Sequence, residues 1–149
     1  MPLLNDTIQA QVRKMLENMH LPVKLVMFTQ GEGGALECAM CADTRMLISE
    51  VAELSDKLRV EIHDFVGEAS LAEDYRVDKI PAILVLPDEP EGPNYGVRLF
   101  GIPAGYEFGS LLEDILMVSQ RKPDLNPQTL QELARLDKPV HIQVLVTPT

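Results

Sequence analysis

Helix-like and strand-like segments alternate regularly along the 149 residues, and few folds accommodate this order. In residues 5–19, apolar side chains recur every three or four positions behind Asn5 and Asp6, which predicts an amphipathic helix capped by one of these two residues. Residues 23–28, VKLVMF, predict a strand that is buried on both faces. Helical periodicity returns in residues 38–55, and the period-two alternation of KLRVEIHDF, residues 57–65, predicts a second strand.

The second half of the chain predicts a hairpin with helices on either side of it in the sequence. Residues 68–75 predict a short helix, residues 82–86 a buried strand, and residues 97–100 its hairpin partner across a long loop rich in proline and glycine. A broad apolar stripe over residues 107–119 predicts a longer helix. Strand-helix-strand steps give parallel neighbours through right-handed crossovers, and the hairpin adds an antiparallel strand. We therefore expect an α/β fold with a four-stranded mixed sheet flanked by helices and an extra N-terminal helix.

The last thirty residues differ from this alternation. In residues 121–139, Asn126 as N-cap and Pro127 at the first helical position predict a linking helix. Residues 140–149, VHIQVLVTPT, predict a strand with no hairpin partner or crossover after it in the chain. We therefore divide the chain into a main unit at residues 1–120, a linking helix at 121–139 and the first strand of an incomplete second unit at 140–149. An exposed apolar strand edge invites pairing, so we also expect a homodimer through this strand.

Charge and hydropathy exclude several kinds of partner. Thirteen basic against twenty-three acidic residues give a formal net charge of −10, a field that repels nucleic acid and anionic lipid. No apolar run approaches the roughly 18 residues that a membrane span needs, and the N-terminal MPLLNDTIQAQ lacks the basic region and apolar core of a signal peptide. We expect a cytoplasmic protein that binds neither nucleic acid nor membrane.

The chain has two cysteines, Cys38 and Cys41, separated by Ala39 and Met40. Structural disulfides are rare in the cytoplasm, so the pair is expected to be catalytic, redox-sensing or metal-binding. Thiol-disulfide exchange needs one exposed thiolate and a second thiol that resolves the mixed disulfide. If Cys38 lies at the helix cap and Cys41 in the first turn, the positive end of the helix favours the Cys38 thiolate. These positions predict Cys38 as nucleophile and Cys41 as resolving thiol, with no bound cofactor because the electrons reside on the sulfurs.

Two other interpretations of the cysteines stay open. They could be buried core residues, since cysteine is among the most often buried residue types. They could also hold zinc, but a zinc site needs four ligands and the three histidines, His20, His63 and His141, are far away in sequence. Only a dimer sharing two such pairs would complete a tetrahedral site, so no metal site is predicted within one chain. The glycine-rich GEGG lacks the Lys-Ser/Thr of a phosphate-binding loop.

A second feature is the dipeptide Ile80-Pro81, directly before the third predicted strand. An X-Pro bond adopts the cis form far more readily than any other peptide bond. The predicted layout resembles the thioredoxin fold, in which this turn faces the C-x-x-C pair and offers backbone groups to an extended peptide. The resemblance implies that Pro81 is cis and that Ile80 and Pro81 shape a substrate groove.

The motif ECAMC, followed by ISEVAELSDKLRVEIHDF, YRVDKIPAILV and FGIPAGYEFGSLLEDI, resembles the first half of the glutaredoxin-like protein disulfide oxidoreductases of thermophilic bacteria and archaea. The resemblance covers essentially the whole chain. Members of that family carry two thioredoxin-fold units in tandem, each with a C-x-x-C and a cis-proline, and they reduce, oxidise or rearrange protein disulfides. The resemblance implies protein disulfides as substrates and an NADPH-dependent flavoprotein of the thioredoxin-reductase type as electron donor.

The chain departs from this family in two respects. PVHIQVLVTPT is similar to the opening strand of the second unit, but the second C-x-x-C is absent, as in a truncated chain, a natural half-protein or a product that lost its remainder. Glu37, Asp43 and Glu32 place negative charge near the thiols, which opposes thiolate formation and predicts slower exchange than in a typical thioredoxin. In a similar fold, the N-terminal module of the flavoprotein component of alkyl hydroperoxide reductase, one of two halves has lost its cysteines and serves as a docking surface. The alternative is therefore a non-catalytic docking or structural module of a larger redox protein, with buried or slow thiols.

Overall fold

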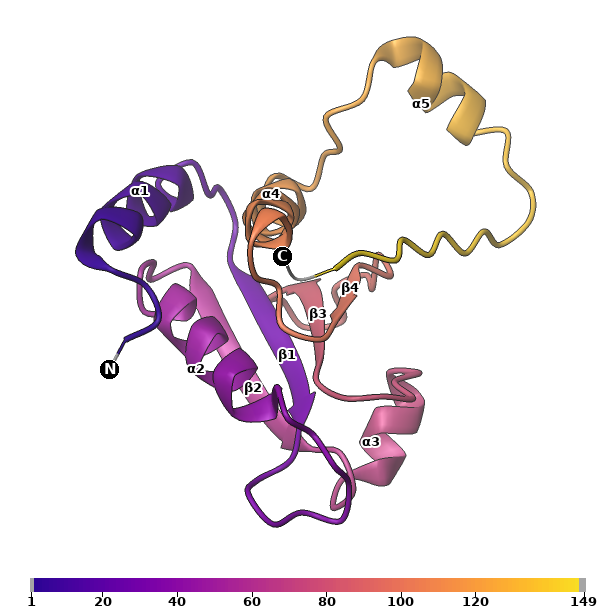
Figure 1. Ribbon diagram of the computed structural model, residues 1–149. Helices are drawn as coiled ribbons and strands as arrows, with labels where there is room; N and C mark the ends of the chain where they lie inside the picture. Colours follow the sequence, from indigo (N-terminus) through magenta and orange to yellow (C-terminus); the bar gives the residue numbers. More distant parts are fainter. Residues whose placement is uncertain (1, 148–149) are drawn as a thin grey trace.

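The computed structural model describes residues 2–147, and its secondary structure follows the expected alternation. In chain order the elements are α1 (Asp6–Leu16), β1 (Val23–Thr29), α2 (Cys41–Ala52), β2 (Leu58–Asp64), α3 (Ala69–Asp74), β3 (Ala82–Pro87), β4 (Arg98–Phe100), α4 (Tyr106–Gln120) and α5 (Pro127–Leu133). The sheet lies in the middle of the molecule, with α1, α2 and α4 close to it and α5 extending away (Figure 1). No helix within residues 2–147 is long and apolar enough to cross a membrane.

The described strands form one four-stranded mixed sheet in the order β2-β1-β3-β4. Strands β1 and β2 are parallel, with Val23 opposite Leu58. Strand β3 runs antiparallel to β1, with Leu25 opposite Val85, and β4 runs antiparallel to β3. The predicted α/β class, with a mixed sheet, flanking helices and an additional N-terminal helix, is confirmed.

The expected direction of β3 was wrong, because a strand-helix-strand step from β2 had predicted that β3 would be parallel to its neighbour. Helix α3 has six residues and is about 9 Å long, whereas a seven-residue strand spans about 23 Å. A helix this short does not carry the chain back to the edge of the sheet where β2 began. The chain therefore enters β3 from the edge where β2 ended, close to α3 (Figure 1), and β3 runs in the opposite direction.

Apolar side chains form a core on each face of the sheet, because successive strand residues point to opposite faces. Leu25 and Val85 belong to the larger core, which α1, α2 and α4 cover. Val26 and Leu84 belong to the smaller core, which is completed by residues in and next to α3. The prediction that β1 is buried on both faces is confirmed, since all of its residues except Lys24 are buried.

The N-terminal helix is held at both its cap and its preceding residues. The side chain of Asn5 accepts a hydrogen bond from the backbone N–H of Ile8 at 2.9 Å, so Asn5, rather than Asp6, is the N-cap of α1. The backbone N–H groups of Leu3 and Leu4 donate to the two carboxylate oxygens of Glu50 in α2, each at 2.8 Å. These contacts attach the start of the chain to the helix that follows the cysteine motif.

The C-terminal part contains the predicted helix but not the predicted strand. Helix α5 begins at Pro127, and the Asn126 side chain caps it by accepting from the backbone N–H of Thr129 at 2.8 Å. Residues 140–147 form no strand, because no strand of the described chain lies beside them to complete a ladder. Their apolar side chains are exposed, Ile142 to 83% and Leu145 to 87%. Residues 148–149 of the expected strand lie outside the described residues, as does residue 1 of the expected main unit.

Candidate active site

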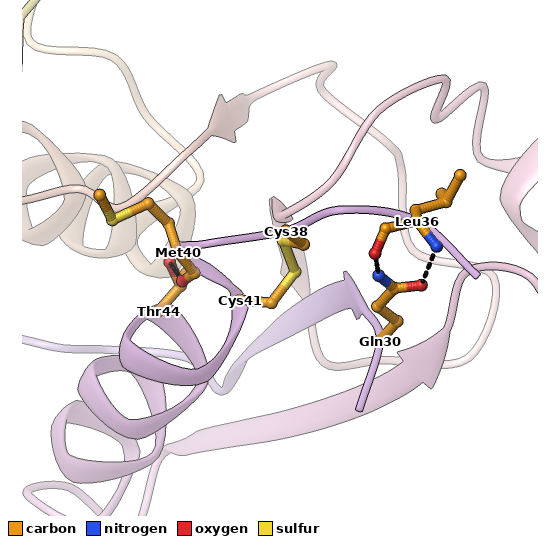
Figure 2. Close-up of a disulfide and its surroundings, with 6 residues drawn as sticks. All are labelled: Gln30, Leu36, Cys38, Met40, Cys41 and Thr44. Atoms are coloured by element: carbon orange, nitrogen blue, oxygen red, sulfur yellow. Dashed lines mark hydrogen bonds between the residues drawn. A yellow bond between two sulfur atoms is a disulfide. The ribbon is translucent and has the colours of Figure 1, made fainter. Parts of the chain in front are cut away.

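Cys38 and Cys41 are joined in a disulfide with a Cα–Cα distance of 5.5 Å, which is in the usual range for such bonds. Their side chains meet in front of the first turn of α2 (Figure 2). Within residues 2–147, no group of three or more His, Cys, Asp or Glu side chains could hold a metal ion. The disulfide brings together the two residues that the spacing predicted as a pair.

The two cysteines differ in their exposure. Cys41 is the first residue of α2 and is 3% exposed, whereas Cys38 lies in the segment before the helix and is partly exposed. Exchange with another protein needs this asymmetry, because the attacking sulfur must be accessible while the resolving sulfur must be protected from the solvent. The roles of nucleophile for Cys38 and resolving thiol for Cys41 stay a prediction, and this difference in exposure is the one that they require.

The start of the helix lies later than expected. The sequence pattern predicted a helix from about residue 38, with Cys38 at the cap, but Met40 is the N-cap of α2. The carbonyl of Met40 accepts from the Thr44 backbone N–H at 2.9 Å and from the Thr44 hydroxyl at 2.6 Å, so it receives the first helical hydrogen bond. Residues 38–41 form a turn in which the Cys41 N–H donates to the Cys38 carbonyl at 3.4 Å. Cys38 therefore precedes the cap by two residues.

The Ile80-Pro81 peptide bond is cis, the isomer that the resemblance implied. Pro81 is buried, and its carbonyl accepts from the backbone N–H of Gly101 at 2.9 Å. Ala82, the next residue, lies opposite Phe28 near the end of β1. Because the loop that carries the cysteines also leaves the sheet at the end of β1, the Ile80-Pro81 turn and this loop lie at the same edge of the sheet.

Exposed apolar side chains flank the disulfide. Leu36 is 43% exposed and Met40 is 45% exposed, and Met46 on α2 is also exposed. Leu36 and Met40 were not predicted from the sequence to have a role, although Met40 lies within the motif and Leu36 lies two residues before it. This apolar surface lies within a region that also carries the exposed acidic residues Glu37 and Asp43.

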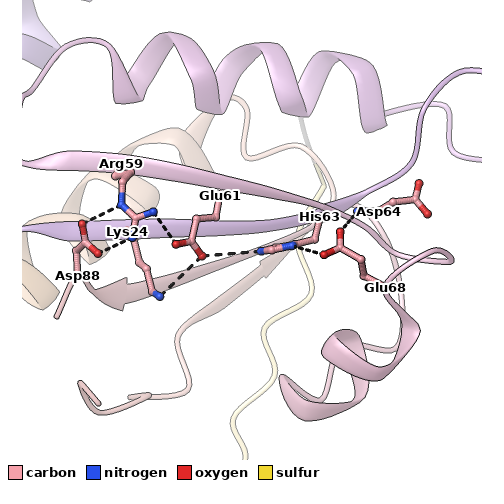
Figure 3. Close-up of polar contacts among 7 residues, drawn as sticks. All are labelled: Lys24, Arg59, Glu61, His63, Asp64, Glu68 and Asp88. Atoms are coloured by element: carbon pink, nitrogen blue, oxygen red, sulfur yellow. Dashed lines mark hydrogen bonds and ion pairs between the residues drawn. The ribbon is translucent and has the colours of Figure 1, made fainter. Parts of the chain in front are cut away.

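Figure 3 shows a charged cluster on the sheet that does not involve the cysteines. Arg59 donates two hydrogen bonds to the Asp88 carboxylate, at 2.7 and 3.0 Å, and holds the pKa of that carboxyl below its usual value. His63 Nδ1 lies 2.9 Å from Glu68, and this contact is the main cause of the lowered pKa of the Glu68 carboxyl. The His63 ring also packs against Phe28 of the smaller core, with ring centroids 5.4 Å apart. His63 is thus a strand residue paired with carboxylates.

A mixed sheet in this order, with a C-x-x-C pair at the start of the helix after β1 and a cis-proline before β3, defines a unit of the thioredoxin fold. No protein-family model matches the chain. Among solved structures, the chain is similar to a protein disulfide oxidoreductase from Aeropyrum pernix, with 24% identity and a TM-score of 0.75 over 89% of this chain and 55% of that one. It is also similar to the NTD_N/C domain of alkylhydroperoxide reductase AhpF from Enterococcus faecalis, with 20% identity and a TM-score of 0.77 over 91% of this chain and 62% of that one.

Sequence comparison finds the F component of alkyl hydroperoxide reductases among its matches. The chain is 29% identical over 147 residues to the F component of the alkyl hydroperoxide reductase of Staphylococcus epidermidis, covering 99% of this chain and 25% of the relative. The corresponding component from Staphylococcus aureus is 26% identical over the same length. The chain therefore spans about a quarter of the length of the curated relatives that it matches.

Proposed function

We propose that this chain is a thiol-disulfide oxidoreductase that acts on protein disulfides through Cys38 and Cys41. The observation that carries the proposal is the disulfide between a partly exposed Cys38 and a buried Cys41 at the start of α2. The reaction needs no bound cofactor, because the two electrons transferred reside on the two sulfurs.

In the reducing direction, the Cys38 thiolate attacks one sulfur of a substrate disulfide. A bond forms between Cys38 Sγ and that sulfur, the substrate S–S bond breaks, and the other substrate sulfur leaves as a thiolate and is protonated. The Cys41 thiolate then attacks Cys38 Sγ and releases the first substrate sulfur as a thiol. The substrate gains two electrons, and the protein is left with the Cys38–Cys41 disulfide.

The substrate would lie along the edge of the sheet that carries both loops. The partly exposed Ile80 and the backbone at the buried Pro81 are proposed to form one side of the groove, and the exposed Leu36 and Met40 provide apolar contacts next to the disulfide. Apolar side chains beside a reactive pair suit polypeptide substrates, whose exposed hydrophobic segments would be desolvated there. An NADPH-dependent flavoprotein of the thioredoxin-reductase type is proposed as electron donor, in the cytoplasm, where such donors keep thiols reduced.

The test is a redox titration. The protein is equilibrated with mixtures of reduced and oxidised glutathione, alkylated, and weighed by mass spectrometry to count free thiols. The proposal expects a reversible two-electron transition between a form with two alkylated thiols and one with none. Thiols that stay free under oxidising conditions would contradict it.

The second candidate function is a docking or structural module of a larger redox protein. The observation that favours it is that the chain matches only about a quarter of the length of its alkyl hydroperoxide reductase relatives. A docking module predicts slow alkylation of both thiols in the reduced, folded protein, whereas the oxidoreductase predicts that Cys38 reacts fast and Cys41 slowly.

We also propose that the C-terminal segment, residues 140–147, mediates pairing with a second copy of the chain. Its exposed apolar side chains, Ile142 and Leu145 among them, would be covered by such pairing. A chain that ends after Pro139 is expected to have half the mass of the full chain by light scattering. A full-length Ile142→Lys variant places a charge in the same segment and is also expected to dissociate. An unchanged mass in the shortened chain would contradict the pairing.

A further inference from the structure

The segment between β1 and the cysteines, residues 31–37, contains no helix or strand and is exposed throughout. The two cysteines therefore differ in how they are held. Cys41 is fixed by its burial and by its place in α2, but Cys38 follows directly on this irregular segment. Whatever holds the segment also decides where the Cys38 sulfur lies relative to Cys41.

One side chain holds the segment at both of its ends. The Oε1 of Gln30, the residue after β1, accepts a hydrogen bond from the Leu36 backbone N–H at 3.1 Å. The Nε2 of the same side chain donates to the Leu36 carbonyl (Figure 2). We call this pair of hydrogen bonds the amide clamp. In the amide clamp the NH₂ group of Gln30 faces the Leu36 carbonyl, and the amide oxygen of Gln30 faces the Leu36 N–H. Only one orientation of the Gln30 amide satisfies both hydrogen bonds.

Gly34 has no side chain, and this leaves room for the amide clamp. A Cβ added at Gly34 would lie 2.5 Å from both Cδ and Oε1 of Gln30 and 3.0 Å from its Cγ, and these are the three nearest atoms it would meet. A free glutamine side chain could move aside, but this one is held by its two hydrogen bonds. Gly31, in the same segment, has no atom within 4 Å of an added Cβ.

We propose that Gln30 is a positioning residue for the redox couple, and that its amide clamp, seated against Gly34, favours closure of the Cys38–Cys41 disulfide. Leu36 is two residues before Cys38, so the Cys38 Cα lies within about 7 Å of the Leu36 Cα. Holding Leu36 in place therefore limits where Cys38 can move. Restricting Cys38 in this way raises the effective concentration of its thiol next to Cys41, because less conformational freedom is lost when the bond forms. The inference rests on the proposed function, since it concerns the same sulfurs.

The measured quantity is the equilibrium between the protein disulfide plus two molecules of reduced glutathione and the protein dithiol plus one molecule of oxidised glutathione. In Gln30→Ala, the equilibrium constant for forming the protein disulfide is expected to fall about tenfold, which makes the two-electron reduction potential about 30 mV less negative. Gln30→Glu keeps the size of the side chain but sets a carboxylate oxygen against the Leu36 carbonyl, so it is expected to shift the potential in the same direction.

Gly34→Ala tests whether the amide clamp needs the space that Gly34 leaves beside the Gln30 side chain. It is expected to reproduce the shift of Gln30→Ala, because the added methyl group displaces the amide. The double variant Gln30→Ala with Gly34→Ala is expected to match Gln30→Ala alone, since the atoms that the methyl group would meet are then gone. Gly31→Ala, the matched control, is expected to keep the potential of the unmodified protein.

The thermal midpoint of each variant is measured beside its potential, because a merely structural role would lower the midpoint and leave the potential unchanged. The inference is overturned if Gln30→Ala has the potential of the unmodified protein, or if the effects of Gln30→Ala and Gly34→Ala add in the double variant. Either result would leave the proposed function standing, provided that the unmodified protein shows a reversible couple. An unmodified protein without such a couple would overturn both.

Discussion

Replacing Cys38 by serine is expected to lower the reduction of a protein disulfide such as that of insulin by roughly a hundredfold or more, to the uncatalysed background. Cys38 is the more exposed residue of the pair, and a serine hydroxyl neither forms a thiolate nor accepts a disulfide bond. The measurement is turnover of the substrate in the presence of dithiothreitol, with the unmodified protein alongside. Unchanged turnover in Cys38→Ser would contradict the assignment of the nucleophile.

Cys41→Ser is the matched control, because it removes the other sulfur of the same pair. Without the buried resolving thiol, the mixed disulfide between Cys38 and the substrate has no internal route of release. This variant is therefore expected to accumulate a covalent complex with the substrate that is visible under non-reducing conditions and disappears on reduction. If both variants behave alike, the division of roles between the two cysteines is wrong.

Ser119→Ala is expected to reduce the free energy of unfolding by about 2 kcal/mol. The Ser119 hydroxyl, fully buried in the last turn of α4, accepts from the backbone N–H groups of His20 at 2.8 Å and Leu21 at 3.1 Å and donates to the Leu21 carbonyl at 2.7 Å. It thereby fastens α4 to the connection between α1 and β1. In the alanine variant the Leu21 N–H keeps the Ser119 carbonyl as acceptor at 3.3 Å, but the His20 N–H and the Leu21 carbonyl lose the hydroxyl, and these lost hydrogen bonds are the source of the expected destabilisation.

Denaturant unfolding measures this effect. Ser110→Ala, an exposed serine on the same helix, is the matched control and is expected to change stability by less than about 0.5 kcal/mol. The reduction potential of Ser119→Ala is expected to equal that of the unmodified protein, because Ser119 contacts the chain just before β1, whereas the cysteine loop follows the other end of this strand. A variant as stable as the unmodified protein would show that the contact adds no net stability.

The local character of the elements follows from the sequence. The apolar periodicity of residues 5–19 and the alternation of residues 57–65 identify a helix and a strand, since the spacing of side chains on one face differs between the two. Asn126 and Pro127 likewise identify the start of α5, because capping and the fixed φ of proline act within a few residues. The C-x-x-C spacing brings its two sulfurs together because the two cysteines are also close in the chain.

Contacts between segments far apart in the chain were harder to predict from the sequence. The direction of β3, antiparallel to β1, was not predicted from the sequence, and the apolar pattern of residues 140–146 predicted a strand that has no neighbouring strand among the described residues. Backbone hydrogen bonds in a sheet join different segments, so a strand-like pattern becomes a strand only where a partner lies beside it. The contacts of Ser119 with residues 20 and 21 also join positions far apart in the chain.

The class of fold, the cysteine pair and the order of the helices and strands could be predicted from the sequence, because they depend on side-chain periodicity and on residues close together in the chain. The direction of β3, the difference in exposure between Cys38 and Cys41, and the contact of the Gln30 amide with Gly34 became visible in the folded structure. Each of these depends on which surfaces meet in space, and surfaces meet only when all the elements are packed together.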